Sequence, residues 1–321
     1  LNGTLSLPST LKYLGRYGNG PTSETDDEGT DYYGGVFQGC SGFTGNLVIP
    51  DNVELIRGYC FSGCNGFYGD LRLPSKLKRM GVCAFSYCSG LTGSLTIPQG
   101  VISIPSEAFN NCGFDGTLTL HDGIVNIAND AFANCHFKGE LHLPRNLKTL
   151  SNNAFGNNDF SGNLNLPSTL MHIGSSAFAN NWRLMGVLDI PYGVESIGES
   201  AFSNCRMLEG LVLPESLETI RRGAFKNCYG VGSIVCKGTM PPYVQSGAFD
   251  GVAKDNFTLE VPESAVQQYQ AAGGWCEFKR IAAKNAKDLI KQGFRDIERQ
   301  QLSEMWGEYE NEAVSALVTK I

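Results

Sequence analysis

The sequence lacks the features on which several common classes of protein depend. It contains no run of about 18 apolar residues, the length that a membrane-spanning helix needs, so we expect no membrane-spanning segment. Basic residues are not clustered, and 25 Lys and Arg stand against 32 Asp and Glu, a net charge of −7. Because nucleic-acid binding requires clustered Lys and Arg to neutralise phosphates, we expect no nucleic-acid partner.

Catalytic motifs are missing as well. Only four histidines occur, and neither H-E-x-x-H, G-x-S-x-G, nor a glycine-rich phosphate motif is present. No C-x-x-C pair exists to support zinc or dithiol chemistry. His121, which replaces a strand-ending proline, is predicted to be structural. The sequence therefore predicts a protein that is not an enzyme and needs neither a metal nor a cofactor.

A repeat dominates what the sequence does contain. A phenylalanine recurs every 23 or 24 residues, usually after an alanine and three places before a cysteine, which Asn158 and Asn181 replace in two repeats. An alternating apolar pair closed by proline follows, as in 95–98, and predicts a short strand that ends at a corner. The recurring phenylalanines are Phe37, Phe61, Phe85, Phe109, Phe132, Phe155, Phe178, Phe202, Phe225 and Phe249.

Units of this length cannot bury their apolar side alone, but stacked units can, each contacting only its neighbours. At roughly 4.8 Å for each stacked strand, ten coils would form a rod or arc about 50 Å long. We therefore predict a mainly β solenoid of about ten coils of 23–24 residues, with a C-terminal helical cap and extension.

The consensus I-G-x-x-A-F-x-x-C-x-x-L-x-G-x-L-x-L-P resembles the BspA-like leucine-rich repeat family over about residues 1–281. The end of the array is similar too, from Pro241-Pro242 through a last Ala248-Phe249 to Trp275 and Phe278. The resemblance implies a leucine-rich-repeat fold and a secreted or cell-surface protein of the Bacteroidetes type, anchored as an outer-membrane lipoprotein. Its relatives are associated with adhesion to host matrix proteins and other cells.

Two details qualify this resemblance. The sequence opens inside a repeat and without Met, so we expect an N-terminal export segment to have been removed. Some strands are preceded by an extra glycine, which we expect only to loosen a turn; these are Gly45, Gly69, Gly93 and Gly186.

We divide the chain into a solenoid (1–262), a cap (263–281) and an amphipathic helical extension (282–321). Pro262 suits the first turn of a short helix over 263–272, and Gly273 and Gly274 would end it. In the extension, apolar residues recur every three to five positions, the pattern of an amphipathic helix. The extension either folds back as a cap or docks a partner or a second copy.

An insertion interrupts the first coil. Leu14 lies 23 residues before Phe37, whereas Ile56 lies five residues before Phe61. Loops on a rigid scaffold often carry function, although the acidic residues of this one do not have the spacing of a calcium-binding loop. The insertion is either a tolerated surface loop or a binding loop whose candidates are Asp26, Asp27, Asp31, Tyr32 and Tyr33.

The variable position inside the strands provides the main binding-site hypothesis. In leucine-rich repeats this position faces outward along the sheet, and polar residues gather there in the middle coils. An ordinary solvated strand face is the alternative interpretation. The predicted binding patch comprises Arg72, Glu140, His142, Asn165 and Asp189.

Eleven cysteines invite a disulfide interpretation. Seven of them occupy one repeat position, where we expect core, and their side chains would point in parallel, which is poor disulfide geometry. Asparagine at the same position in two repeats indicates a side chain that hydrogen-bonds the backbone of a turn. The repeated cysteines are therefore predicted to be free, buried thiols.

Together these features predict a non-enzymatic binding scaffold that recognises a host or bacterial surface protein, or a glycan, through the strand face. The alternative is a structural or accessory subunit of an outer-membrane assembly, docked by 282–321. A carbohydrate-binding module is a third hypothesis and needs exposed aromatic platforms. Its candidates are Tyr32, Tyr33 and Trp182, the last in a position where a turn can bury it.

Overall fold

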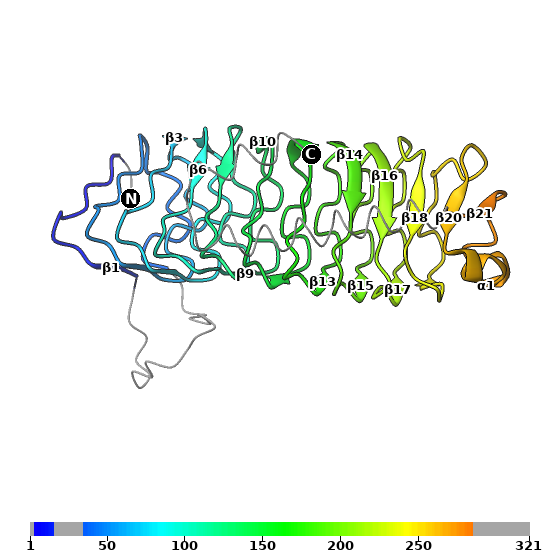
Figure 1. The fold of residues 1–321 in the computed structure, drawn as a ribbon. Coiled ribbons are helices and arrows are strands. Elements are labelled where there is room, and N and C mark those ends of the chain that lie inside the picture. Colours follow the sequence, from blue (N-terminus) through cyan, green and yellow to red (C-terminus); the bar gives the residue numbers. More distant parts are fainter. Residues whose placement is uncertain (1–2, 16–34, 285–321) are drawn as a thin grey trace, which may run out of the picture.

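The structure, a computed structural model, describes residues 3–15 and 35–284. In this part the chain winds into an elongated β-solenoid of about ten coils, with one short helix near its C-terminal end (Figure 1). The predicted mainly β solenoid is confirmed. The five residues proposed for the insertion (Asp26, Asp27, Asp31, Tyr32 and Tyr33) and residues 285–321 of the predicted extension lie outside the described residues.

Among the described residues, none of the helices has the length and apolar character needed to cross a membrane.

Short parallel strands from successive coils build two sheets on opposite edges of the solenoid (Figure 1). The first sheet is broadest at β14 and β16, which have seven residues each, whereas most strands have two or three. Its strands, in order, are β10 (Lys138–Gly139), β12 (Asp159–Asn163), β14 (Arg183–Asp189), β16 (Met207–Leu213), β18 (Ile234–Cys236), β20 (Leu259–Val261) and β21 (Ile281–Ala283).

The second sheet consists of two-residue strands, one from each of seven coils. Its order is β19 (Tyr243–Val244), β17 (Thr219–Ile220), β15 (Ser196–Ile197), β13 (His172–Ile173), β11 (Thr149–Leu150), β9 (Asn126–Ile127) and β7 (Ser103–Ile104). Smaller sheets serve the N-terminal coils: β1 (Tyr13–Leu14) with β2 (Leu55–Ile56) and β4 (Arg79–Met80), β3 (Gly69–Asp70) with β5 (Leu91–Thr92), and β6 (Leu95–Thr96) with β8 (Leu118–Thr119).

The recurring phenylalanines form a stacked ladder through the core. Rings from adjacent coils have centroids 5.3–5.7 Å apart and planes within 2–15° of each other. A shorter ladder of Phe114, Phe137 and Phe160 packs edge-on against it in the middle coils. Each aromatic pair of this kind adds about 0.5–1.5 kcal/mol beyond the burial of its surface.

The repeated cysteines tie each coil to the coil before it. The Cys88 thiol donates a hydrogen bond to the Phe61 carbonyl oxygen at 3.0 Å, and the same bond recurs in the other described coils that carry a buried cysteine here. Where asparagine replaces cysteine, the Asn158 amide donates to the Phe132 carbonyl at 2.9 Å and Asn181 to that of Phe155 at 2.8 Å. The predicted role of this position is confirmed.

Aromatic side chains cover the last coil of the solenoid. After β20 the chain forms a 3₁₀ turn, η1 (Glu263–Ala265), and the helix α1 (Val266–Ala271), close to the helix expected over 263–272. The buried Trp275 lies 5.4 Å from Phe249, the last ring of the ladder, and donates from Nε1 to the Pro242 carbonyl. The strand β21 then pairs with β20, so Ala282 and Ala283, assigned from the sequence to the helical extension, add a strand instead.

The extra glycines do more than loosen a turn, which corrects the expectation from the sequence. All four have positive φ, from 73° to 89°, a conformation that other residues adopt at a cost. A Cβ at Gly186 would also collide with the Asn163 amide of the preceding coil, and one at Gly93 with the Asp70 carboxylate. Gly93 and Gly186 therefore also allow neighbouring coils to approach closely.

Burial controls the chemistry of the repeated thiols. It raises the pKa of Cys64 to about 11 and the pKa values of Cys135 and Cys228 to about 12, from an ordinary value of 9.0. For the fully buried Cys112 and Cys205 it raises the pKa well above the ordinary value. These thiols therefore stay protonated at neutral pH, as their hydrogen bonds to carbonyl oxygens require.

We predict that Asn181→Leu lowers the free energy of unfolding by about 0.5–1.5 kcal/mol, because the Phe155 and Phe178 carbonyls each lose one buried donor. Each carbonyl keeps another donor, the Asn158 amide and the Cys205 thiol respectively. Asn181→Cys should stay close to the parent, since a thiol makes the same bond elsewhere and the Asn181 Oδ1 has no partner among the described residues. Urea unfolding followed by circular dichroism compares the three proteins. A leucine variant as stable as the parent would contradict this role.

We also predict that stability falls as pH rises above 9. The folded pKa values exceed the ordinary one, so the unfolded chain loses its thiol protons first. The stabilisation is fully present below pH 9 and is lost toward pH 12, by at most about 1.4 kcal/mol per pH unit for each thiol.

Melting temperatures measured between pH 7 and pH 11 test this prediction. A variant with Cys135→Asn and Cys228→Asn is the control, because asparagine keeps the hydrogen bond without the titrating thiol. Its melting temperature should fall less steeply above pH 9 than that of the parent. Equal slopes for the two proteins would refute the explanation.

Candidate functional site

All five predicted strand-face side chains are exposed. Glu140, His142, Asn165 and Asp189 lie in or just after strands of the first sheet, whereas Arg72 pairs with Val48 outside that sheet. His142 is paired with Asn165 of the next coil, and Asp189 is the last residue of β14. The His142 Nε2 lies 3.6 Å from a carboxylate oxygen of Glu140. The structure thus brings Glu140, His142 and Asn165 together. Arg72 is set apart from them by coils that carry Thr96 and Thr119 at the same position.

The acidic residues of the strand-face patch have basic neighbours. Asp189 has Lys237 at 3.7 Å, and Glu140 has His142, so its acids have basic neighbours. Such exposed pairs contribute little to stability, typically 0–1 kcal/mol each. Neither of the two surface hollows described below includes these residues. The five strand-face residues are exposed polar or charged side chains on neighbouring strands, an arrangement suited to a broad contact.

A second polar surface lies on the turn that follows the cysteine position. A hollow of about 360 Å³ is lined there by Asn180, Trp182, Asn204 and Arg206. Trp182 is 46% exposed, so the turn does not bury it. In the sequence, the residue directly after the cysteine position changes from coil to coil. In the later coils it is His136, Asp159, Trp182, Arg206 and Tyr229.

Asparagine side chains form a ladder beside this hollow. Each amide Nδ2 donates to the Oδ1 of the asparagine one coil earlier, at 2.6–3.0 Å. Most of these asparagines have positive φ, a conformation that asparagine tolerates better than most residues, which explains why it recurs there. The asparagine ladder consists of Asn110, Asn134, Asn157, Asn180, Asn204 and Asn227.

Two arginines lie against exposed aromatic rings at the same surface. The guanidinium carbon of Arg183 is 5.2 Å from the Trp182 ring centroid, and that of Arg206 is 6.0 Å from the Tyr229 ring. Tyr229 is 55% exposed, and its hydroxyl donates to the Asn227 Oδ1 at 3.0 Å. Neither arginine forms an ion pair with any described residue.

We call this surface the turn-face site and define it as Asn180, Trp182, Arg183, Asn204, Arg206 and Tyr229. Of these residues, only Trp182 was a candidate from the sequence. The available signal was the variability of the position that directly follows the buried Cys or Asn in these coils. The six side chains come together through contacts between coils, and the local sequence pattern does not show these contacts.

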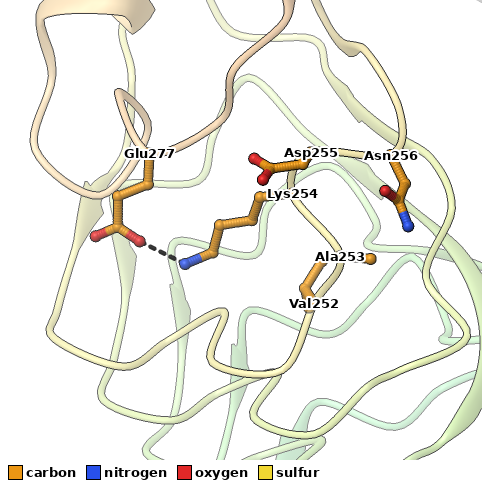
Figure 2. Close-up of a pocket in the computed structure, with 6 residues that line it drawn as sticks. All are labelled: Val252, Ala253, Lys254, Asp255, Asn256 and Glu277. Atoms are coloured by element: carbon orange, nitrogen blue, oxygen red, sulfur yellow. Dashed lines mark hydrogen bonds and ion pairs between the residues drawn. The ribbon is translucent and has the colours of Figure 1, made fainter.

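Another hollow, of about 430 Å³, lies where the last coil meets the cap (Figure 2). Lys254 forms an ion pair with Glu277 across it, and Lys279 is 2.6 Å from an Asp255 carboxylate oxygen. Arg280 also donates to the Asp255 carbonyl. The charged groups at this hollow therefore join the cap to the solenoid rather than converge on empty space.

The remaining ionisable groups serve structural contacts. His121 accepts a hydrogen bond from the Gly123 amide at Nδ1, with Nε2 3.0 Å from the Pro98 carbonyl, in keeping with its predicted structural role. The Arg145 guanidinium lowers the pKa of Asp122 in an exposed pair. No group of three or more His, Cys, Asp or Glu side chains that could hold a metal ion occurs within residues 3–15 and 35–284.

Solved structures with a similar arrangement come from several bacteria. A leucine-rich repeat protein from Bacteroides ovatus is 20% identical, over 77% of this chain and 85% of that chain, with a TM-score of 0.35. A leucine-rich cell surface protein from Faecalibacterium prausnitzii is 19% identical, over 80% and 84%, with a TM-score of 0.36. The pneumococcal vaccine antigen PcpA is 17% identical, over 75% and 87%, with a TM-score of 0.31.

A comparison with curated proteins gave no match. The family profile described as the BspA type leucine rich repeat region, present in six copies, matches residues 33–159 and 125–256. These ranges overlap and together take in 33–256, more than half of the chain. The protein therefore belongs to the BspA-type leucine-rich repeat family.

Proposed function

We propose that this protein is a non-enzymatic binding scaffold at the cell surface, which recognises a protein or glycan through an exposed face of its repeats. One observation carries the proposal: phenylalanine stays at its buried position from coil to coil, whereas the strand position between the apolar pair changes. That position holds Val48, Arg72, Thr96, Thr119, His142, Asn165, Asp189, Val212 and Val235 in successive coils. It is exposed from Val48 to Asp189, but Val212 is buried and Val235 half-buried.

The exposed side chains of the solenoid are preorganised. A solenoid core of stacked rings and coil-to-coil hydrogen bonds holds the exposed side chains at set intervals before a ligand arrives. Binding then costs less conformational entropy than it would on a flexible loop. A large ligand, such as a surface protein or a long glycan, could contact several coils at once.

The family and one relative support the cell-surface location. The similar protein from Faecalibacterium prausnitzii is described as a cell surface protein. We propose the same location here, with secretion or a lipid anchor as the route. The alternative role, an accessory subunit docked by the extension, depends on residues outside the described ranges and stays a prediction, as does ligand binding by the insertion.

Binding of the purified chain to an array of matrix proteins and glycans tests the proposal. We predict that a variant with Arg72→Ala, His142→Ala and Asp189→Ala weakens the specific interaction at least tenfold, because these changes remove three charged or polar groups of the strand face. Far-UV circular dichroism should be unchanged, since all three side chains are exposed.

A matched variant on other exposed positions is the control. Arg79→Ala, His172→Ala and Glu195→Ala also remove one arginine, one histidine and one acid; Arg79 and His172 lie in strands outside the first sheet. This variant should bind as the parent does. Equal losses in both variants, or no binding by the folded parent to any array member, would count against the strand face as the binding surface.

A further inference from the structure

We infer that the turn-face site binds an acidic oligosaccharide, with one sugar ring packed on Trp182 and a sugar carboxylate held by Arg206 and Arg183. The inference rests on the proposed binding function and gives it a ligand class, but it places that ligand on a different surface from the strand-face patch. Four features of the site support it.

The first feature is the pair of exposed aromatic rings. Trp182 is 46% and Tyr229 55% exposed, whereas the ladder phenylalanines from Phe61 to Phe249 are buried. The C–H groups on one face of a sugar ring form an apolar surface that packs well on an aromatic ring. Tryptophan and tyrosine supply such platforms at a low entropy cost, because each has only two side-chain torsions.

The second feature is the spacing of these rings. Trp182 and Tyr229 are separated by one coil, which carries Arg206 at the same position. Successive coils in this region lie 5.3–5.5 Å apart at the phenylalanine ladder. A glycan chain advances by a similar distance for each sugar unit, so a short oligosaccharide along the solenoid axis would meet Trp182, Arg206 and Tyr229 in turn.

The third feature is the supply of hydrogen-bonding groups. Asn180 and Asn204 line the hollow, and each uses one N–H and one oxygen lone pair within the asparagine ladder. An amide has two N–H donors and two acceptor lone pairs, so one of each remains for sugar hydroxyls. Because the ladder holds the amides in place, these groups are oriented before the ligand binds.

The fourth feature is charge, and it selects an acidic sugar over a neutral one. The protein carries a net charge of −7, yet Arg183 and Arg206 have no acidic partner among the described residues. Among the other exposed arginines, Arg145 pairs with Asp122 and Arg222 with Glu199, whereas Arg72, Arg79 and Arg221 form no ion pair with the described residues. A guanidinium steadied against an aromatic ring presents its N–H groups to a carboxylate in a planar fork.

The hollow has a suitable size for such a ligand. Its volume of about 360 Å³ lies within the range of roughly 300–1,000 Å³ that small-molecule sites occupy.

Isothermal titration of the full chain with defined oligosaccharides tests the inference. 3′-Sialyllactose and a hyaluronan hexasaccharide supply a terminal and an internal carboxylate, and lactose is the neutral counterpart of the first. We predict binding of at least one acidic probe and at least tenfold weaker binding of lactose. Whichever acidic probe binds identifies the source of the carboxylate, and binding of both supports recognition of the carboxylate itself.

Two variants separate the stacking contact from the charge contact. Trp182→Ala should abolish binding of the acidic probe, whereas Arg206→Gln should weaken it about tenfold and leave little difference from lactose. Tyr192→Ala, at a 76% exposed aromatic residue outside the site, is the control and should bind as the parent does. The melting temperature of each variant shows that the solenoid is intact.

Three results would overturn the inference: no binding of either acidic probe by the folded parent, equal binding of lactose, or unchanged binding by Trp182→Ala. The strand-face variant with Arg72→Ala, His142→Ala and Asp189→Ala separates this inference from the proposed function. If the acidic probes fail while an array ligand is lost in that variant, the turn-face inference is wrong and the proposed scaffold function stands.

Discussion

Eight successive coils of this solenoid, from the coil of Phe61 to that of Phe225, are each held to the coil before by a hydrogen bond to the carbonyl of a ladder phenylalanine. A thiol donates that bond in most of the described coils, and an amide donates it from Asn158 and Asn181. Because a coil contacts only its neighbours, contacts of this kind fix how one coil aligns with the next. The stacked rings and the paired strands keep the same coil-to-coil register.

The same turn also determines what the surface displays. Its tight path requires positive φ two residues after the phenylalanine, and asparagine fills that position in the middle and later coils. The amides then stack into a ladder on the outside, only one residue from the buried cysteine position. Trp182, Arg206 and Tyr229 directly follow that position, so a core contact anchors each of them. The turn-face site is thus a consequence of how the core is built.

The two candidate surfaces meet on one strand. β14 begins at Arg183, which packs on Trp182, and ends at Asp189 of the strand-face patch. β14 and β16 are the two longest strands of the sheet (Figure 1). The coils that contribute these strands also carry Arg183 and Arg206, which have no acidic partner among the described residues. A ligand that spans both surfaces would lie across these coils.

The sequence by itself determined the period, the core positions and the family of this protein. Those features repeat, and an apolar residue that recurs at the same position of stacked coils is expected to be buried. The exchange of Cys for Asn at 158 and 181 also indicated the hydrogen bond that this position makes. The tertiary structure decided the exposure of Trp182, the close packing at Gly186 and the grouping of Arg206 with Tyr229. These depend on side chains from different coils at positions that do not repeat, and only their arrangement in space shows which of them meet.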